Sequence, residues 1–128
     1  MTLKSAKSSR KLAVSAARLA LEKKARDVKM LSVGKMSIVA DYFLILTGNS
    51  ATQVHTICDH LVESLKKEGH FALRVEGYRE GWWVVIDYGD LVVHIFQPEA
   101  RIFYDLERLW SKAPEVSPAL YTESSGDN

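Results

Sequence analysis

The chain has 128 residues, which is the length of a single domain. Hydrophobic residues make up 47% of it and charged residues 26%, as in ordinary globular domains, and no apolar run is long enough to cross a membrane. The one cysteine, Cys58, excludes an internal disulfide and an all-cysteine zinc site, and it indicates a reducing compartment.

Charge is distributed unevenly along the chain. Residues 1–26 contain eight basic residues and one acidic residue, for a net charge of +7, whereas residues 27–128 contain nine basic and fifteen acidic residues, for a net charge of −6. An acidic body repels nucleic acid and favours basic partners, so we expect no direct contact with DNA. We interpret the basic start as an amphipathic helix that follows a disordered segment, residues 1–8; an organellar transit peptide is the alternative.

Two helices in the first half of the chain are predicted by the spacing of their apolar residues. The first is capped by Ser8 or Ser9, and the second begins after Ser50, with Gln53 completing a capping box. The buried face of the first helix is predicted to hold Leu12, Ala16, Leu19 and Ala20. That of the second is predicted to hold Val54, Ile57, Cys58, Leu61 and Leu65.

Five strands are predicted, at residues 27–33, 42–47, 71–76, 82–87 and 90–96. The continuous apolar run at 42–47 (YFLILT) is typical of a central strand that is covered on both faces. A helix joins this strand to the one at 71–76, so we expect these two strands to be parallel. The order of elements indicates a single α/β domain.

Residues 82–96 predict a hairpin with Tyr88 and Gly89 as its turn, which places Asp87 opposite Asp90. Side chains alternate between the two faces of a strand. One face is wholly apolar and is predicted to lie in the core: Trp82, Val84, Ile86, Leu91, Val93 and Ile95. The other face consists of Trp83, Val85, Asp87, Asp90, Val92 and His94. Opposed carboxylates repel each other, so we interpret this face as a site for a cation or a basic partner; polar groups satisfied beneath a helix are the alternative.

Pro98 predicts the first turn of a last helix, over residues 98–110. Its apolar residues fall within about 120° of arc and predict a buried face of Ile102, Phe103, Leu106, Leu109 and Trp110. Tyr104 points away from them and is a candidate interface residue. We place the domain at residues 9–110 and predict an extended or disordered tail over residues 111–128, which contain several Pro and Ser.

No catalytic constellation is evident in the sequence. Residues 47–50 (TGNS) lie between a strand and a helix and could bind an anion through free backbone N–H groups, but they lack the phosphate-binding glycine patterns. His55, Asp59 and Glu63 share one helical face, which we interpret as solvated and not as a metal site. We therefore predict no catalytic residue, no metal and no cofactor, and a binding module in place of an enzyme.

Four blocks of the sequence carry a more specific signal: 41–50 (DYFLILTGNS), 83–90 (WVVIDYGD), 92–96 (VVHIF) and 101–110 (RIFYDLERLW). Together with Gln53 and the Glu76-Gly77 pair, they closely resemble the ribosomal silencing factor family, RsfS, also called Iojap. The blocks occur in the same order and at compatible spacings, and the resemblance covers about residues 9–116.

The resemblance implies a mixed five-stranded sheet flanked by helices, with a topology like that of nucleotidyltransferases, in a protein that is not an enzyme. Family members bind the large ribosomal subunit through its basic ribosomal protein number fourteen. They thereby block the joining of the small subunit and repress translation when nutrients are scarce. Bacterial members are cytoplasmic, relatives occur in mitochondria and chloroplasts, and free members tend to form homodimers.

The binding surface of the family is aromatic and acidic, and it maps onto Trp83, Asp87, Asp90 and Tyr104, with Glu76 and His94 as further candidates. A register slip of one residue would exchange Trp83 for Trp82. The alternative function is a nucleotidyltransferase-like enzyme that binds magnesium and a nucleoside triphosphate. Its site would use Gly48, Ser50, Asp87 and Asp90.

Overall fold

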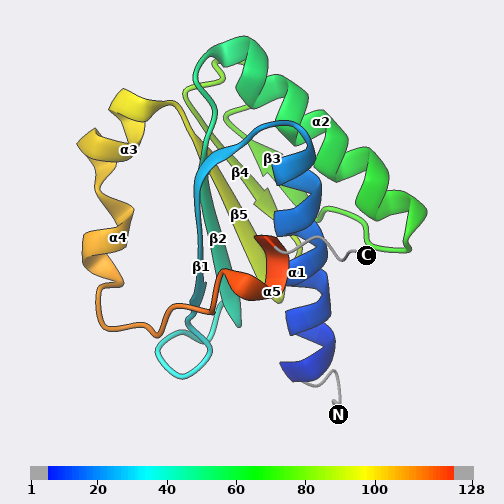
Figure 1. The fold of residues 1–128 in the computed structure, drawn as a ribbon, viewed down its shortest axis with the longest axis vertical. Helices are drawn as coiled ribbons and strands as arrows, with labels where there is room; N and C mark the ends of the chain where they lie inside the picture. Colours follow the sequence, from blue (N-terminus) through cyan, green and yellow to red (C-terminus); the bar gives the residue numbers. More distant parts are fainter. Residues whose placement is uncertain (1–5, 123–128) are drawn as a thin grey trace.

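A computed structural model describes residues 6–122 and shows a five-stranded sheet with helices on both faces (Figure 1). The strands are β1 (Arg26–Ser32), β2 (Tyr42–Thr47), β3 (Arg74–Glu76), β4 (Trp83–Asp87) and β5 (Leu91–Phe96), in the spatial order β1-β2-β5-β4-β3. Only β2 and β5 pair in parallel, so the predicted single mixed sheet is confirmed. The likeness to nucleotidyltransferase topology stays a prediction. No helix within the described residues is long and apolar enough to cross a bilayer.

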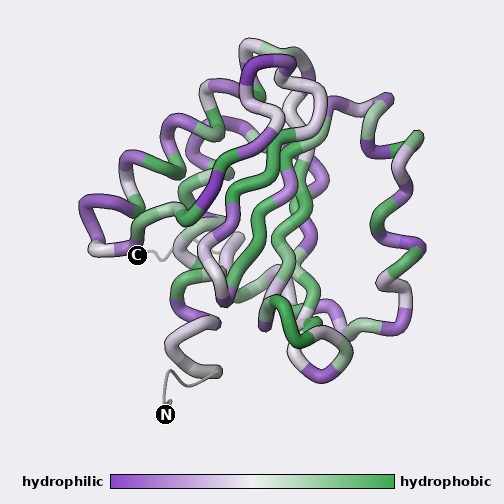
Figure 2. The backbone as a smooth tube through the Cα atoms, turned by 180° about the vertical axis from the view of Figure 1, so that it is seen from behind, coloured by the Kyte–Doolittle hydropathy of each residue, from purple (hydrophilic) through white to green (hydrophobic). Residues whose placement is uncertain are grey.

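The central strands are hydrophobic along most of their length, and the two long helices alternate between hydrophobic and hydrophilic residues (Figure 2). All six residues of β2 are buried, which confirms the prediction of a central strand. Because β2 and β3 are separated by β5 and β4, the helix between them joins strands that run in the same direction without being neighbours.

The helix α1 (Ala6–Glu22) packs on the sheet through small residues. Ala13, Ala16, Ala17 and Ala20 are fully buried and Leu12 nearly so, whereas the predicted core residue Leu19 is only half-buried. Alanine lets a helix approach a sheet closely, because no side chain beyond Cβ intervenes.

The predicted start of α1 at Ser8 or Ser9 is wrong, because the helix already includes Ala6. Ser9 is buried within the helix, and its hydroxyl donates a hydrogen bond to Asp41 Oδ2 at 2.8 Å. Residues 6–8 are therefore helical and not part of a disordered segment; residues 1–5 lie outside the described part of the chain.

The second helix, α2 (Ala51–Lys67), begins as predicted, with Ser50 Oγ accepting a hydrogen bond from the Gln53 backbone N–H. Gln53 Oε1 accepts from the Asn49 N–H, and Gln53 Nε2 donates to the carbonyls of Lys23 and Lys24. One side chain thus satisfies backbone groups at the end of α1 and the start of α2. The predicted buried face of α2 is confirmed in full.

The hairpin of β4 and β5 is shifted by two residues from its predicted register. Asp87 pairs with Val92, and the Tyr88 N–H donates to the Leu91 carbonyl, so the turn consists of Gly89 and Asp90. Gly89 has a φ of 87° at the first turn position, where type II′ hairpin turns favour glycine. An even shift preserves the two faces of the hairpin.

The apolar face of the hairpin is core, as predicted, for five of its six residues. Fully buried are Val84, Ile86, Leu91, Val93 and Ile95. Trp82 is the exception, because it precedes β4 and is 39% exposed.

The predicted last helix is broken into α3 (Pro98–Tyr104) and α4 (Leu106–Leu109) at Asp105, which has a left-handed φ of 48°. Pro98 starts α3 as predicted. The predicted buried face is wrong, because the residue that α3 buries fully is Ala100. Ile102, Phe103 and Leu109 are 76–79% exposed, and Leu106 and Trp110 are half-buried.

The predicted domain end at residue 110 is too early. The Ser32 N–H donates to the Pro114 carbonyl and the Val116 N–H to the Met30 carbonyl, so this segment extends along β1. It leads into the short helix α5 (Ala119–Thr122), in which Tyr121 is 2% exposed. Part of the predicted tail is therefore an ordered layer beside α1; residues 123–128 lie outside the described part of the chain.

Candidate docking surface

The face of the sheet opposite α1 and α2 gathers most of the candidate residues. The register places Trp83, Val85 and Asp87 of β4 on one face with their β5 partners Phe96, His94 and Val92. Arg74 and Glu76 of β3 pair with Asp87 and Val85 and so belong to the same face. We call this surface, together with Tyr104 of α3, the aromatic–acidic face.

Aromatic rings form a continuous cluster on this face. Trp83 stacks on Phe96 with 5.0 Å between ring centroids, and the Tyr104 ring lies 4.6 Å from that of Trp83. Tyr104 is 43% exposed and Trp83 is half-buried. The structure therefore brings these two candidates together, with Trp83 and not Trp82 on the face.

His94 lies beneath this ring cluster and not on the surface. It is 7% exposed, and its Nδ1 accepts a hydrogen bond from the Trp83 indole N–H at 3.2 Å. Burial lowers the pKa of His94 to about 4, so the ring is neutral near pH 7. Its Nε2 has no hydrogen-bond partner within the described residues. An unpartnered buried N–H costs about 1–3 kcal/mol.

The carboxylates of the aromatic–acidic face are paired with a cation that the sequence analysis did not identify. Asp87 Oδ2 accepts from Arg74 at 3.2 Å, and Asp87 Oδ1 accepts from the Gly89 N–H at 2.8 Å. Glu76 lies 3.8 Å from Arg74 and its side chain is 65% exposed. The three side chains together carry a net charge of −1.

Asp90 lies in the hairpin turn, where its backbone carbonyl accepts hydrogen bonds from the N–H groups of Asp41 and Tyr42. The predicted opposition of Asp87 and Asp90 is wrong, because Asp87 faces Val92. Asp87 therefore lies opposite an apolar side chain, and the expected repulsion between two directly opposed carboxylates does not arise.

Exposed apolar side chains extend this face beyond the predicted residues. Phe103 adjoins Tyr104, with 5.0 Å between the ring centroids, and Ile102 of α3 and Leu109 of α4 are further exposed apolar residues. We call these three residues the α3–α4 apolar patch. Large exposed apolar patches on globular proteins commonly mark sites of interaction. The apolar spacing in the sequence identified these residues but predicted that they face the core.

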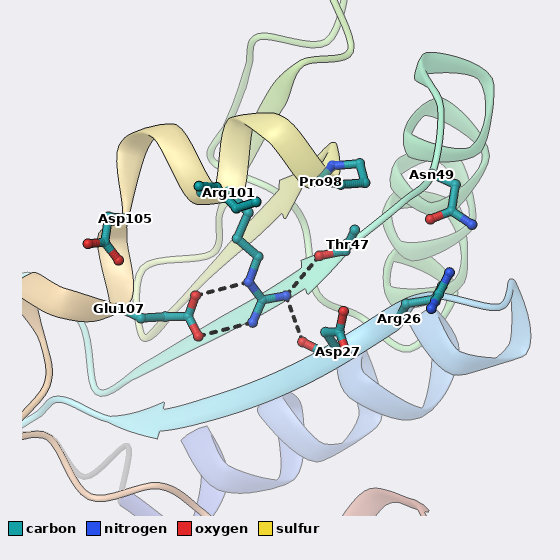
Figure 3. A pocket seen from close by; sticks show the side chains of 9 residues that line it. Arg26, Asp27, Thr47, Asn49, Pro98, Arg101, Asp105 and Glu107 are labelled. Carbon is teal, nitrogen blue, oxygen red and sulfur yellow. Dashed lines mark hydrogen bonds and ion pairs between the residues drawn. The ribbon is translucent and has the colours of Figure 1, made fainter.

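Arg101 holds α3 and α4 against the sheet (Figure 3). Its Nε and Nη2 donate to the two Glu107 oxygens at 2.9 and 3.2 Å, and its Nη1 donates to Thr47 Oγ1 and to the Asp27 carbonyl. The hydrogen bonds from Arg101 keep the pKa of Glu107 below its usual value, against the effect of partial burial. Arg101, Glu107, Thr47 and Asp27, which these hydrogen bonds join, line part of the adjoining cavity of about 480 Å³.

The alternative enzyme site is not assembled. The N–H groups of Gly48 and Asn49 donate to the Phe96 carbonyl and to Gln53 Oε1, so two of the predicted anion-binding donors are occupied. Gly48 follows the last residue of β2, whereas Asp87 aligns through Val92 with the start of β2, roughly 15 Å away along the strand.

Potential metal ligands are likewise dispersed. Within residues 6–122 no three His, Cys, Asp or Glu side chains come together as a metal site. The helical face with His55 and Asp59 is occupied by Tyr78, whose ring stacks on His55 and whose hydroxyl donates to Asp59. Burial raises the pKa of the Cys58 thiol to about 12, so it is not a reactive thiolate.

Comparison with known proteins identifies the family. The family model described as "Ribosomal silencing factor during starvation" matches residues 6–128. The chain is 44% identical over 95 residues to ribosomal silencing factor RsfS of Halalkalibacterium halodurans, covering 74% of this chain and 81% of the relative. This chain belongs to the ribosomal silencing factor family. The resemblance inferred from the sequence blocks is confirmed.

Two further relatives extend the comparison. A crystal structure of protein CV0518 from Chromobacterium violaceum aligns with a TM-score of 0.76 at 29% identity, covering 95% of this chain and 96% of that one. The mouse protein named "Mitochondrial assembly of ribosomal large subunit protein 1" is 32% identical over 93 residues, covering 70% of this chain and 41% of its own length. The chain is thus similar to bacterial proteins and to a mouse protein that its name places in mitochondria.

Proposed function

We propose that this protein silences ribosomes by binding the large subunit through the aromatic–acidic face and the α3–α4 apolar patch. Membership of the ribosomal silencing factor family supports the large subunit as its target. The observation that carries the choice of surface is the contact between the half-buried Trp83 ring and the exposed Tyr104 ring, against which the exposed Phe103 packs. Tryptophan and tyrosine are common anchors of protein interfaces.

The proposed contact is ribosomal protein number fourteen, a basic protein. Residues 27–128 carry a net charge of −6, and Asp87 and Glu76 lie on the same face of the sheet as Trp83, with Asp90 in the adjoining hairpin turn. Charge complementarity of this kind accelerates encounter and fixes orientation, while buried rings supply most of the affinity.

Silencing of this kind requires no covalent chemistry and no cofactor. A protein that occupies the surface where the small subunit must dock makes the two binding events mutually exclusive. The extent of the block then depends on the affinity and on the concentration of the silencing protein. We propose that this repression acts under nutrient limitation, in the bacterial cytoplasm; an organellar matrix is the alternative location.

Co-sedimentation with purified large subunits tests the proposed surface. Tyr104→Ala removes an exposed ring from the surface and is expected to weaken binding by more than about 1 kcal/mol, or about fivefold. Trp82→Ala is the matched control, because Trp82 is also an exposed aromatic residue but lies outside β4 and the ring cluster. Failure of the unmodified protein to sediment with large subunits removes the proposal.

The same apolar patch suits a homodimer of the free protein, which we propose as its resting state. Three large side chains that are at least 76% exposed favour self-association in the absence of a partner. Addition of the ribosomal protein is expected to convert dimer to heterodimer in analytical ultracentrifugation. If the dimer persists in the complex with the ribosomal protein, self-association uses a surface other than the α3–α4 apolar patch.

A further inference from the structure

The basic residues near the start of the chain are not used by the proposed function. Residues 1–26 carry a net charge of +7, against −6 for residues 27–128. In the structure most of this segment is the helix α1, and cationic side chains along it and in the turn after it are exposed. We call five of them the basic ridge: Arg10, Lys11, Arg18, Lys23 and Lys24.

Neighbouring carboxylates do not neutralise the basic ridge. Within residues 6–122, none of its five cations forms an ion pair, and the Arg18 guanidinium donates a hydrogen bond to the Leu120 carbonyl at 2.8 Å. By contrast, the guanidinium groups of Arg74 and Arg101, on the other side of the sheet, are paired with carboxylates. The basic ridge therefore offers its positive charge to a partner.

Part of the basic ridge lines a groove of about 720 Å³ beside α1: Arg10, Lys11 and Arg18. Glu22 and Glu68 line the groove as well, but each carboxylate already accepts a hydrogen bond. Glu22 accepts from His60 Nε2 at 2.8 Å, and Glu68 accepts from the Ser15 hydroxyl at 3.0 Å. Three cations and two carboxylates leave the groove with a net positive charge, so it favours an anion.

The helix α1 lies on the opposite side of the sheet from the aromatic–acidic face (Figure 1). A helix with its side chains is about 10 Å wide, and the Debye length at physiological ionic strength is about 8 Å. The negative charge of the aromatic–acidic face is therefore largely screened at the outer surface of α1. The two surfaces can bind partners of opposite charge at the same time.

The basic ridge lacks the side chains that anchor a protein or a membrane. The sequence of α1 contains no aromatic residue, and its alanines are buried on the sheet. Among the residues that line the groove, Leu120 is the exposed apolar one, at 40%. Protein interfaces are commonly anchored by Trp and Tyr, and helices that lie on membranes insert large apolar side chains. Cations without such anchors are typical of surfaces that bind phosphates.

The length of the basic ridge suits a polymer of phosphates. From Arg10 to Lys23 it extends over roughly 20 Å, at 1.5 Å per helical residue. We propose that the basic ridge binds the phosphate backbone of RNA in the large ribosomal subunit, without reading the base sequence. The choice of RNA rests on the proposed function, whereas the affinity for a row of phosphates follows from the basic ridge alone.

A short RNA duplex of arbitrary sequence is the probe in the absence of ribosomes. A variant that combines Arg10→Gln, Lys11→Gln and Lys23→Gln changes exposed side chains only, and it is expected to bind the duplex about tenfold more weakly at low salt, by fluorescence anisotropy. The charge-matched control combines Lys66→Gln, Lys67→Gln and Arg79→Gln, at exposed positions outside the basic ridge, and should bind like the unmodified protein.

Three results of the duplex experiment overturn the inference. One is failure of the unmodified protein to bind the duplex at low salt, and another is equal loss of binding in the two variants. The third is competition by polyglutamate or by anionic phospholipid vesicles as effective as that by unlabelled duplex, because it removes the assignment to RNA.

The salt dependence of large-subunit binding tests the same contact in the complex. Each phosphate contact contributes roughly 0.7–0.9 to the slope of log affinity against log salt, so the basic-ridge variant should lose about 2 from this slope and the control variant nothing. Tyr104→Ala, on the other side of the sheet, should weaken binding without changing the slope.

The two experiments separate the two proposals. If the unmodified protein binds subunits, and the basic-ridge variant matches the control variant in affinity and in slope, the inference is overturned and the proposed function stands. If the unmodified protein does not bind subunits but binds the duplex through the basic ridge, the proposed function is removed and RNA binding by α1 is supported.

Discussion

At the scale of single residues, Trp83 connects the exposed and buried parts of the docking surface. Its ring contacts Tyr104 on the outside and Phe96 beneath, while its N–H donates to His94. A tryptophan held by two rings and a hydrogen bond loses little conformational entropy when a partner binds. The geometry therefore favours a preorganised anchor.

Burial of a neutral His94 predicts a specific loss of stability in acid. The pKa falls from 6.5 to about 4 on folding, so below pH 6.5 the unfolded chain takes up a proton that the folded protein does not. Stability is lost as the pH falls from 6.5 toward 4, by about 2 kcal/mol at pH 5 relative to pH 7.5. Urea unfolding at the two pH values measures this loss.

The matched comparison for this prediction is His94→Phe, which removes the titrating group. Its stability is expected to change less with pH than that of the unmodified protein by about the same 2 kcal/mol. The other histidines contribute equally to both proteins and cancel. An identical pH dependence in the two proteins contradicts a buried neutral His94.

The alternation of side chains between the two faces of a strand was sufficient to predict which hairpin residues lie on the face away from the larger core. Trp83 and Asp87 could be assigned to the second face because neighbouring strand residues point in opposite directions. The burial of His94 could not be predicted in this way, since it depends on rings from β2 and β4 that pack over it. The pairing of Arg74 with Asp87 could not be predicted either, because it depends on the register of β3 against β4.

At the scale of elements, the hydrogen bonds of Arg101 to Glu107, Thr47 and the Asp27 carbonyl fix the position of α3 and α4 on the sheet. Arg101→Met is expected to destabilise the protein by about 2 kcal/mol, because it removes the donor to the Asp27 carbonyl and both guanidinium hydrogen bonds to Glu107, which keeps only its ion pair with Lys29 at 3.5 Å. Arg108→Met, at an exposed position in α4, is the control. Hydrogen exchange should accelerate in α3 and α4 of the Arg101 variant alone; equal protection in both variants contradicts this role.

Gly77 positions the segment that carries Trp83. A Cβ at Gly77 would clash with the Trp83 carbonyl oxygen, so Gly77→Ala is expected to displace β4 and to cost more than about 2 kcal/mol. Gly69→Ala is the matched control, because Gly69 also has a positive φ, of 94°, but a Cβ there meets nothing within 4 Å. Chemical denaturation measures the free energy of unfolding of both variants. Equal losses in the two would contradict a steric clash at Gly77.

The break between α3 and α4 shows where prediction of elements from the sequence fails. The apolar spacing over residues 98–110 indicated one helix, but the left-handed Asp105 ends α3 and allows Glu107 to reach Arg101. The helix α2 and the strands β4 and β5 were predictable because their apolar residues repeat at one period within each element, whereas β3 is shorter than the predicted 71–76. The outward direction of the α3–α4 apolar patch could not be predicted. It follows from the packing of Ala100 and Arg101 against the sheet, which turns the larger side chains outward.

At the scale of the whole molecule, the two faces of the sheet have different tasks. One is sealed by α1, α2 and α5 and holds the larger core. The other is covered only in part by α3 and α4, which leaves rings, carboxylates and a cavity of about 190 Å³ accessible. Segregation of this kind lets a protein of one domain present a wide docking surface without loss of its core.

Light scattering of ribosomal subunit association tests the central claim most directly, because it measures the block itself. Excess unmodified protein, added to large subunits before small subunits, is expected to suppress association. Tyr104→Ala should need at least fivefold more protein for the same effect, and Trp82→Ala should need no more than the unmodified protein. Association that proceeds unchanged in the presence of saturating unmodified protein would contradict the account.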